Sequence, residues 1–168
     1  MANPRILKNF NLFVDGRGQA GKIDELELPT LTIKTEEHRA GGMDAPAELD
    51  MGMEALSAGF TLAEYDENVL RLFGLADGNA VQLTARGALQ KDGEPVTPVV
   101  VNMRGMLKEA ELGTWQAGEK ATPKFTIALR YYRYESGGVV LHEIDVENMV
   151  RIVNGVDQLA QIRAAIGV

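Results

Sequence analysis

The sequence predicts a mainly β protein, an antiparallel β barrel or sandwich with one flanking α-helix and a short C-terminal helix. Apolar and polar residues alternate with a period of two through most of the chain, and Gly- and Asp-containing turns separate the alternating runs. Only two short stretches show helical spacing. We expect all 168 residues to form a single domain (1–168), because a chain of this length can build a sufficient core without disulfides or metals.

The first strands are predicted from the N-terminus to about residue 34. A strand over residues 6–14 ends at Asp15-Gly16-Arg17-Gly18, whose residue types suit a tight turn. A second strand runs from Ile23 until Pro29, and Leu31 and Ile33 alternate with polar residues in a third.

Residues 40–54 fit this strand-and-turn pattern least. Residues 40–46 are rich in Gly and Pro, and Leu49, Met51 and Met53 then alternate with polar residues and continue as a strand to Leu62. The segment is too apolar for a solvent-exposed loop without contacts and too long for a hairpin connection, so we expect an extended loop at about 40–54. It either docks onto another subunit or folds back over its own core.

The second half of the chain predicts a short helix, further strands and a final helix. The first helix lies between an N-cap at Asp66 and a C-cap at Gly74. Strands follow at 81–85, 96–107, 124–134 and 139–144, with turns at 90–94 and 136–138. Leu159, Ile162 and Ile166 have the spacing of a C-terminal helix.

Charge and cysteine content exclude several classes of protein. The net charge is −7, so the chain is expected to repel nucleic acid. Residues 35–78 hold ten acidic and two basic residues, and this segment therefore carries the whole acidic excess, either as a solvated face or as a complementary surface. No cysteine is present, which excludes disulfides, thiolate nucleophiles and Cys-ligated metals and suits a reducing cytoplasm.

No motif predicts a catalytic, cofactor or metal site, so the chain is not expected to be an enzyme. Gly16, Gly18 and Gly21 match a dinucleotide fingerprint, but the sequence continues as a strand where that site requires a helix. The histidines His38 and His142 lack metal-ligand spacing. No apolar run approaches a membrane span, and the N-terminus lacks a signal-peptide core, so no membrane anchoring is expected.

Six sequence blocks, in order along nearly the whole chain, resemble the major tail tube protein family of contractile-tailed phages and R-type pyocins. The blocks are Pro4-Arg5; Leu28-Pro29-x-Leu31-Thr32-x-Lys34; Glu37-His38-Arg39-Ala40-Gly41-Gly42-Met43; Met103-Arg104-Gly105; Glu143-Ile144-Asp145 through Asn148-Met149; and Val153-Asn154-Gly155-Val156-Asp157-x-Leu159.

The resemblance implies a structural protein without cofactor or catalytic site. Family members form homo-hexameric rings that stack into the inner tube beneath a contractile sheath, a conduit for DNA in a phage or for ions in a pyocin. The implied partners are other copies and the sheath, baseplate, tape-measure and tail terminator proteins, in a particle assembled in the bacterial host cytoplasm, with DNA passing without specific binding. Two alternatives are the tube of a secretion-type injection system and a monomeric ligand-binding β barrel with an enclosed apolar pocket.

Within this resemblance, we expect residues 40–54 to contact the adjacent ring. The expected contacts are the apolar anchors Met43, Leu49, Met51 and Met53, the acids Asp44, Glu48, Asp50 and Glu54, and their basic partners Arg5 and Lys8 on the next ring. We expect outward residues of the long strands to line the lumen with acidic or small polar side chains, because a basic wall would retain passing DNA.

Overall fold

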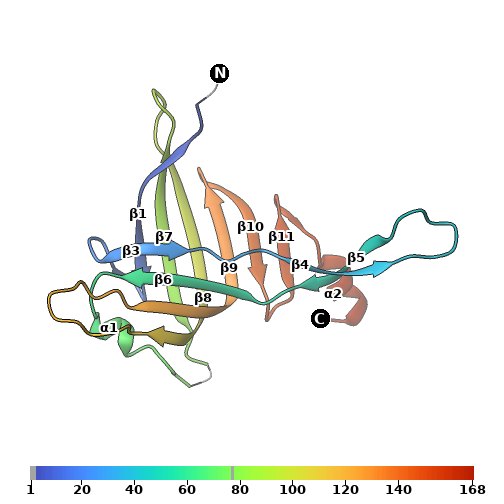
Figure 1. Ribbon diagram of the computed structural model, residues 1–168. Coiled ribbons are helices and arrows are strands. Elements are labelled where there is room, and N and C mark those ends of the chain that lie inside the picture. Colours follow the sequence, from blue (N-terminus) through green and yellow to red (C-terminus); the bar gives the residue numbers. More distant parts are fainter. Residues whose placement is uncertain (1–2, 77) are drawn as a thin grey trace.

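Two long antiparallel strands form the spine of the fold in the computed structural model, which describes residues 3–76 and 78–168. They are β8 (Thr97–Glu111) and β9 (Lys124–Ser136), and they pair over most of their length. Their register shifts between Arg104 and Gly105, opposite Arg130. On one side of this shift the two strands lie in a main sheet, and on the other side they continue into a second layer (Figure 1).

The main sheet has the strand order β12-β11-β10-β9-β8-β7-β1-β2. The additional strands are β1 (Ile6–Val14), β2 (Arg17–Gly18), β7 (Val81–Gln90), β10 (Val139–Asp145), β11 (Val150–Val153) and β12 (Val156–Asp157). The second layer adds β6 (Leu56–Leu62), which pairs with the first half of β9, and β3 (Ile23–Glu27), which pairs with β6. Figure 1 shows β3 and β6 running across the direction of the main strands.

The hydrophobic core lies between these two layers. Phe60 of β6 and Phe125 of β9 stack with ring centroids 5.1 Å apart, and both are buried. Buried side chains of the main sheet, including Leu12, Leu83 and Met103, belong to the same cluster. This arrangement confirms the prediction of a mainly β, antiparallel sandwich.

Gly105 permits the close approach of β8 and β9 at their bend. A Cβ atom at this position would lie 2.0 Å from the carbonyl oxygen of Ala128, which is far inside van der Waals contact. Only glycine fits here without moving the backbone of β9.

The first helix is shorter than predicted, and the C-terminal helix is similar to the predicted one. α1 (Glu67–Leu70) begins after Asp66, whose carboxylate accepts a hydrogen bond from the Asn68 N–H as an N-cap, but it has only four residues. Its C-cap is Arg71, so the prediction of a C-cap at Gly74 is wrong: the chain continues in turns as far as Gly74, whose φ is +72°. α2 (Ala160–Ile166) ends at Gly167 in the left-handed conformation, as expected for a C-terminal helix. Among the described residues, neither helix has the length and apolar character needed to cross a membrane.

The glycine-rich segment after β1 is a tight hairpin turn. Asp15 and Gly16 both have positive φ, +47° and +78°, and β1 pairs with β2 directly across them. The chain continues into β3, so the dinucleotide fingerprint is not followed by a helix. The short strands β2, β11 and β12 were not predicted. The third predicted strand, around Leu31 and Ile33, lies a few residues later in the chain than the sequence indicated.

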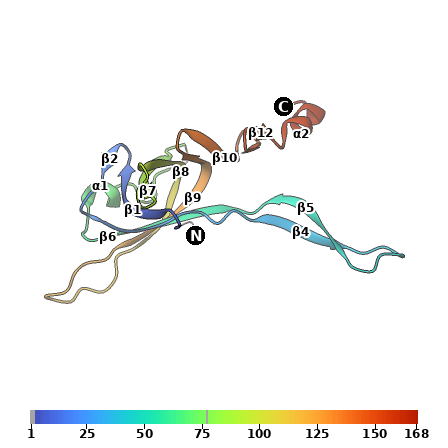
Figure 2. The ribbon, with the colours of Figure 1, turned by 90° about the horizontal axis from the view of Figure 1, so that it is seen from above.

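That third strand, β4 (Ile33–His38), pairs with β5 (Ala47–Met53) in a separate two-stranded sheet. We call residues 33–53 the arm, because they extend away from the sandwich in both views (Figures 1 and 2). The expectation of an extended loop at 40–54 is therefore corrected: pairing reaches His38 and Ala47, so only residues 39–46 form a loop, and the segment is a hairpin after all.

Candidate assembly interface

The arm exposes almost all of its side chains. All six residues of β4 and the first five of β5 are exposed to solvent. A two-stranded hairpin without a packing partner is marginally stable in water. An arm of this length is therefore suited to contact another molecule.

The pairing register places most of the arm's acids on one face. Thr35 lies opposite Asp50 and Glu37 lies opposite Glu48, and paired residues of antiparallel strands point to the same side. The Thr35 hydroxyl donates a hydrogen bond to Glu48 at 3.2 Å. Because Glu37 and Glu48 are like charges directly opposite each other, a cationic partner would stabilise this face. We call Thr35, Glu37, Glu48 and Asp50 the acidic face.

Only two of the four predicted apolar anchors are exposed. Leu49 and Met51 expose 48% and 53% of their surface. Met43 folds back into the tip of the arm, where its sulfur accepts a hydrogen bond from the Ala40 N–H at 3.4 Å. Met53 is half-buried and packs against the core of its own subunit.

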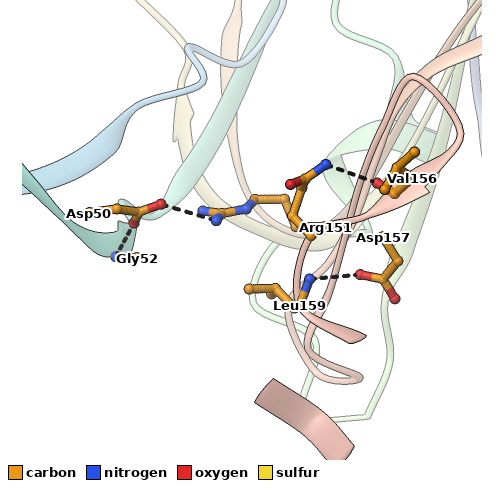
Figure 3. Close-up of polar contacts among 7 residues, drawn as sticks. Asp50, Gly52, Arg151, Val156, Asp157 and Leu159 are labelled. Carbon is orange, nitrogen blue, oxygen red and sulfur yellow. Dashed lines mark hydrogen bonds and ion pairs between the residues drawn. The ribbon is translucent and has the colours of Figure 1, made fainter. Parts of the chain in front are cut away.

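Asp50 differs from the other predicted acids because it fastens the arm to its own subunit. Its carboxylate accepts a hydrogen bond from the Gly52 N–H at 2.8 Å and pairs with Arg151 of β11 at 3.1 Å (Figure 3). The Gly52 hydrogen bond, assisted by Arg151, lowers the pKa of Asp50 below its ordinary value. Asp44, Glu48 and Glu54 are exposed.

Sequence reasoning missed Arg151, which lies 101 residues from Asp50 in the chain. Pairing of such distant residues depends on the sheet topology, and no local pattern signals it. Asp50 is therefore partly neutralised within its own subunit, and the remaining acids carry the charge that is available to a partner.

The predicted basic residues lie far from the arm within one subunit. Arg5 precedes β1, and Lys8 is the unpaired residue at a register shift of β1, between Leu7 and Asn9. Both are exposed, and neither forms an ion pair with any residue in 3–76 or 78–168. Both views place the start of β1 away from the arm (Figures 1 and 2), so contact with the arm requires a second copy.

The C-terminal helix lies beside the base of the arm. Asp157 accepts hydrogen bonds from the Leu159 N–H and from Arg163, and the Arg163 guanidinium also donates to the carbonyl oxygen of Met149 at 2.7 Å. The Arg163 hydrogen bond lowers the pKa of Asp157. These contacts hold α2 against the β11–β12 hairpin.

A groove of about 690 Å³ separates the base of the arm from β10, β11 and α2. We call it the arm-base groove. Its apolar lining includes Met53, Leu56, Ile144, Met149, Leu159 and Ile162. Asp50, Glu54, Asp145 and Arg151 provide polar groups at the same groove.

The described residues contain no cluster of three or more His, Asp or Glu side chains that could hold a metal ion. His38 lies on the arm and His142 on β10, in separate sheets. The exposed side chains of the arm form a surface of the kind that contacts another macromolecule, and a protein with such a contact surface is the class that this fold and site indicate.

Comparison with known proteins identifies the family of this chain. The family described as "Phage tail tube protein FII" matches residues 4–167. The chain is 38% identical over 172 residues to the tail tube protein of Escherichia phage P2, covering 99% of each chain, and 31% identical over 152 residues to the major tail tube protein of Serratia phage KSP20, covering 89% and 88%. The chain belongs to the phage tail tube protein family, which confirms the resemblance seen in its sequence blocks.

Solved structures support the same fold. The chain is similar to a structure described as the PVC sheath/tube terminator of an extracellular contractile injection system, with a TM-score of 0.61 and 11% identity over 79% of this chain and 97% of that chain. A second neighbour, the PVC sheath-tube complex in the extended state, has a TM-score of 0.60 and 11% identity over 79% and 92%. This protein is a structural protein of the tail tube. The comparisons favour this function over the alternative of a monomeric ligand-binding β barrel.

Proposed function

We propose that copies of this chain form hexameric rings that stack into the inner tube of a contractile particle. The observation that carries this proposal is the exposed arm, whose β4 buries none of its six residues against its own subunit. A subunit that projects such a hairpin can contact a copy outside its own ring. The proposed role is structural and involves no catalysis.

The free edges of the main sheet support ring formation. β2 covers only Phe13 and Val14 of β1, and no other described strand pairs with the outer side of residues 6–11. At the other end, β12 covers only Ile152 and Val153 of β11. These edges lie at opposite ends of the sheet, as heterologous contact around a ring requires.

The arm, together with the adjoining Glu54, is the proposed contact between stacked rings. Leu49 and Met51 supply exposed apolar surface, and Asp44, Glu48 and Glu54 supply negative charge. Arg5 and Lys8 on the adjacent ring are the proposed cations, with exposed side chains at the start of β1. Met43 and Met53 stabilise the arm itself more than they contact a neighbour.

The outer face of the main sheet is the proposed wall of the conduit. Val99, Val101 and Met103 of β8 point into the core, so the intervening residues point away from it. Arg86, Arg104, Arg133, Glu135, Glu143 and Asp145 lie on this outer face.

The charges on this proposed wall balance one another. Arg133 lies 3.6 Å from Glu135, the Arg104 guanidinium lies 5.3 Å from the centre of the Tyr131 ring, and the Tyr131 hydroxyl donates to Glu143 at 3.0 Å. We therefore replace the expected acidic or small polar wall with a charge-balanced one. Arg133 and Arg104 already have partners within the wall, so they would bind passing DNA phosphates weakly.

The proposed partners follow from the relatives. One structural neighbour is described as a sheath/tube terminator and another as a sheath-tube complex. We propose that this chain likewise contacts sheath and terminator proteins, and also baseplate and tape-measure proteins. The tube would conduct DNA in a phage particle or ions in a pyocin, after assembly in the bacterial host cytoplasm.

The test is assembly of the purified protein with the arm's charge reversed. Changing Asp44, Glu48 and Glu54 together to Lys should abolish tubes in negative-stain electron microscopy, because the new lysines would repel Arg5 and Lys8 of the next ring. Asp50 is left intact because it fastens the arm to Arg151. The three side chains are exposed, so the free energy of unfolding of the monomer should change by about 1 kcal/mol or less. The melting temperature should therefore stay within about 2–4 °C of the wild type.

A second variant, Arg5→Glu with Lys8→Glu, tests whether these two residues are the cations that contact the arm of the next ring. Each charge-reversed protein should fail to form tubes alone, and a mixture of the arm variant with the Arg5/Lys8 variant should recover rings that alternate along the tube. Normal tubes from the arm variant would refute the stacking contact, and a mixture that never assembles would refute Arg5 and Lys8 as its partners.

A further inference from the structure

The loop between β8 and β9, residues 112–123, presents the most exposed large apolar side chain among those described. Trp115 exposes 83% of its surface and is the one tryptophan in the sequence. Leu112 in the same loop exposes 40%. Tryptophan is the residue type most strongly enriched among side chains that dominate binding energy at protein interfaces.

Contacts on both limbs hold this loop in place. On the outgoing limb, the Tyr65 hydroxyl donates a hydrogen bond to the Leu112 carbonyl oxygen at 2.7 Å, and the Tyr65 and Trp115 rings meet edge to face at 6.3 Å. On the returning limb, the Lys120 ammonium donates to both carboxylate oxygens of Asp24, at 2.9 and 2.7 Å. A loop that is ordered before binding loses less conformational entropy when it binds.

The loop and the arm-base groove lie at opposite ends of the molecule. Figures 1 and 2 show the 112–123 loop extending from one end of the β6 layer and the arm extending from the other. The β1–β2 edge of the main sheet lies at the loop's end, and the β11–β12 edge lies at the groove's end (Figure 1). Joining these two edges between neighbouring copies therefore brings the loop of one copy toward the groove of the next.

The groove suits an indole side chain. Its volume of about 690 Å³ and its lining of Met, Leu and Ile side chains offer apolar surface, and Ile162 of α2 is 48% exposed there. Asp50 and Asp145 supply carboxylate acceptors for the indole N–H, which needs a partner when it is buried. Among the described residues, α2 buries none of its own side chains, so it has apolar surface left for a partner.

We propose that Trp115 of each subunit inserts into the arm-base groove of the neighbouring subunit in the same ring. This contact deepens the proposed ring assembly and rests on it. It would also close the space between the arm and α2, so that ring closure braces the base of the arm for its contact with the next ring.

The single tryptophan makes the proposal directly measurable. Fluorescence of the purified wild-type protein should shift to shorter wavelength, and quenching by iodide should fall several-fold, when tubes form from monomers. Trp115→Ala should raise the protein concentration needed for assembly by about tenfold or more, and Trp115→Phe by less. Phe73→Ala, which removes another half-exposed aromatic side chain, should leave that concentration unchanged.

Disulfide trapping identifies the residues in contact, because the chain contains no cysteine of its own. The variant Gln116→Cys with Val146→Cys places thiols beside Trp115 and at the groove, and oxidation of its assembled form should give a ladder of linked subunits up to one ring. The matched control is Gln116→Cys with Val139→Cys, since Val139 and Val146 are both 58% exposed, but Val139 begins β10 whereas Val146 follows its other end. The control should remain unlinked.

The outcomes separate this contact from the ring itself. Tubes in which the Trp115 fluorescence and quenching stay those of the monomer would overturn the contact alone, as would equal trapping in the two cysteine variants. Burial of Trp115 only after a sheath protein is added would also overturn it. Failure of the wild-type protein to form any ring would overturn the proposed function and this contact together.

Discussion

Individual residues in this protein serve either its fold or its contacts, and their surroundings distinguish the two roles. Gly105 and Asp50 act within the subunit, at the bend of the spine and at the base of the arm. Leu49, Met51 and Trp115 have large apolar surfaces that the subunit does not cover. Substitutions in the first group should therefore affect unfolding, and those in the second group should affect assembly.

Gly105→Ala should strongly destabilise the monomer. The new methyl group would lie 2.0 Å from the Ala128 carbonyl oxygen, so β8 and β9 would have to separate at their bend. We expect a loss of about 3 kcal/mol or more in the free energy of unfolding, measured by urea denaturation, since overpacking against backbone exceeds the usual cost. Gly41→Ala is the matched control because its Cβ would meet nothing within 4 Å, and a loss of similar size there would contradict this explanation.

Asp66 should make stability depend on pH in the acid range. Burial raises the pKa of its carboxyl group, but hydrogen bonds from Lys22 and the Asn68 N–H outweigh burial, so the pKa lies below its ordinary value of 3.8. The unfolded chain therefore takes up the proton more readily, and the stabilisation is complete above that value and is lost as pH falls through the lowered pKa.

Urea denaturation between pH 6 and about pH 2 checks this dependence. The wild type should lose stability below about pH 4, and Asp66→Asn, which keeps an N-capping side chain, should show a flatter profile over the same range. If the free energy of unfolding falls equally steeply with pH in the two proteins, other carboxylates and not Asp66 cause the acid sensitivity.

At the scale of elements, local signals predicted most strands and failed where tertiary pairing decides. The Asp-Gly turn after β1, the N-cap Asp66 and the alternation of β8 and β9 are all visible within a few residues of sequence. The arm was misjudged because Gly41 and Gly42 suggested an irregular loop, although the flanking residues pair as β4 and β5. Trp115 carries no periodic signal, and the Asp50–Arg151 pair joins residues far apart in the chain.

Arg151 should control the order of the arm's base without controlling the fold. Arg151→Ala removes the partner of Asp50 but leaves the Gly52 hydrogen bond, so the sandwich should stay folded. Hydrogen exchange of β5 amides in the monomer should accelerate several-fold, while exchange in β8 stays unchanged. Arg130→Ala, which removes the exposed ion pair with Glu147, serves as the control and should leave β5 protection intact.

At the scale of the whole molecule, the two layers are one continuous structure. β9 pairs with β10 of the main sheet through its second half and with β6 of the second layer through its first half. β6 follows directly from the arm, and the Glu54 N–H binds the Thr32 carbonyl oxygen at 2.9 Å where the arm joins the sandwich. The parts proposed to contact other subunits are thus connected through backbone hydrogen bonds.

This continuity has a mechanical consequence. A pull on the arm acts along the direction of β6, so the hydrogen bonds between β6 and β9 carry the force in shear and must break together instead of one after another. β9 then distributes the force into the main sheet through β8 and β10. A subunit built in this way transmits load between its arm and both of its layers as a stiff body, which suits a component of a tube.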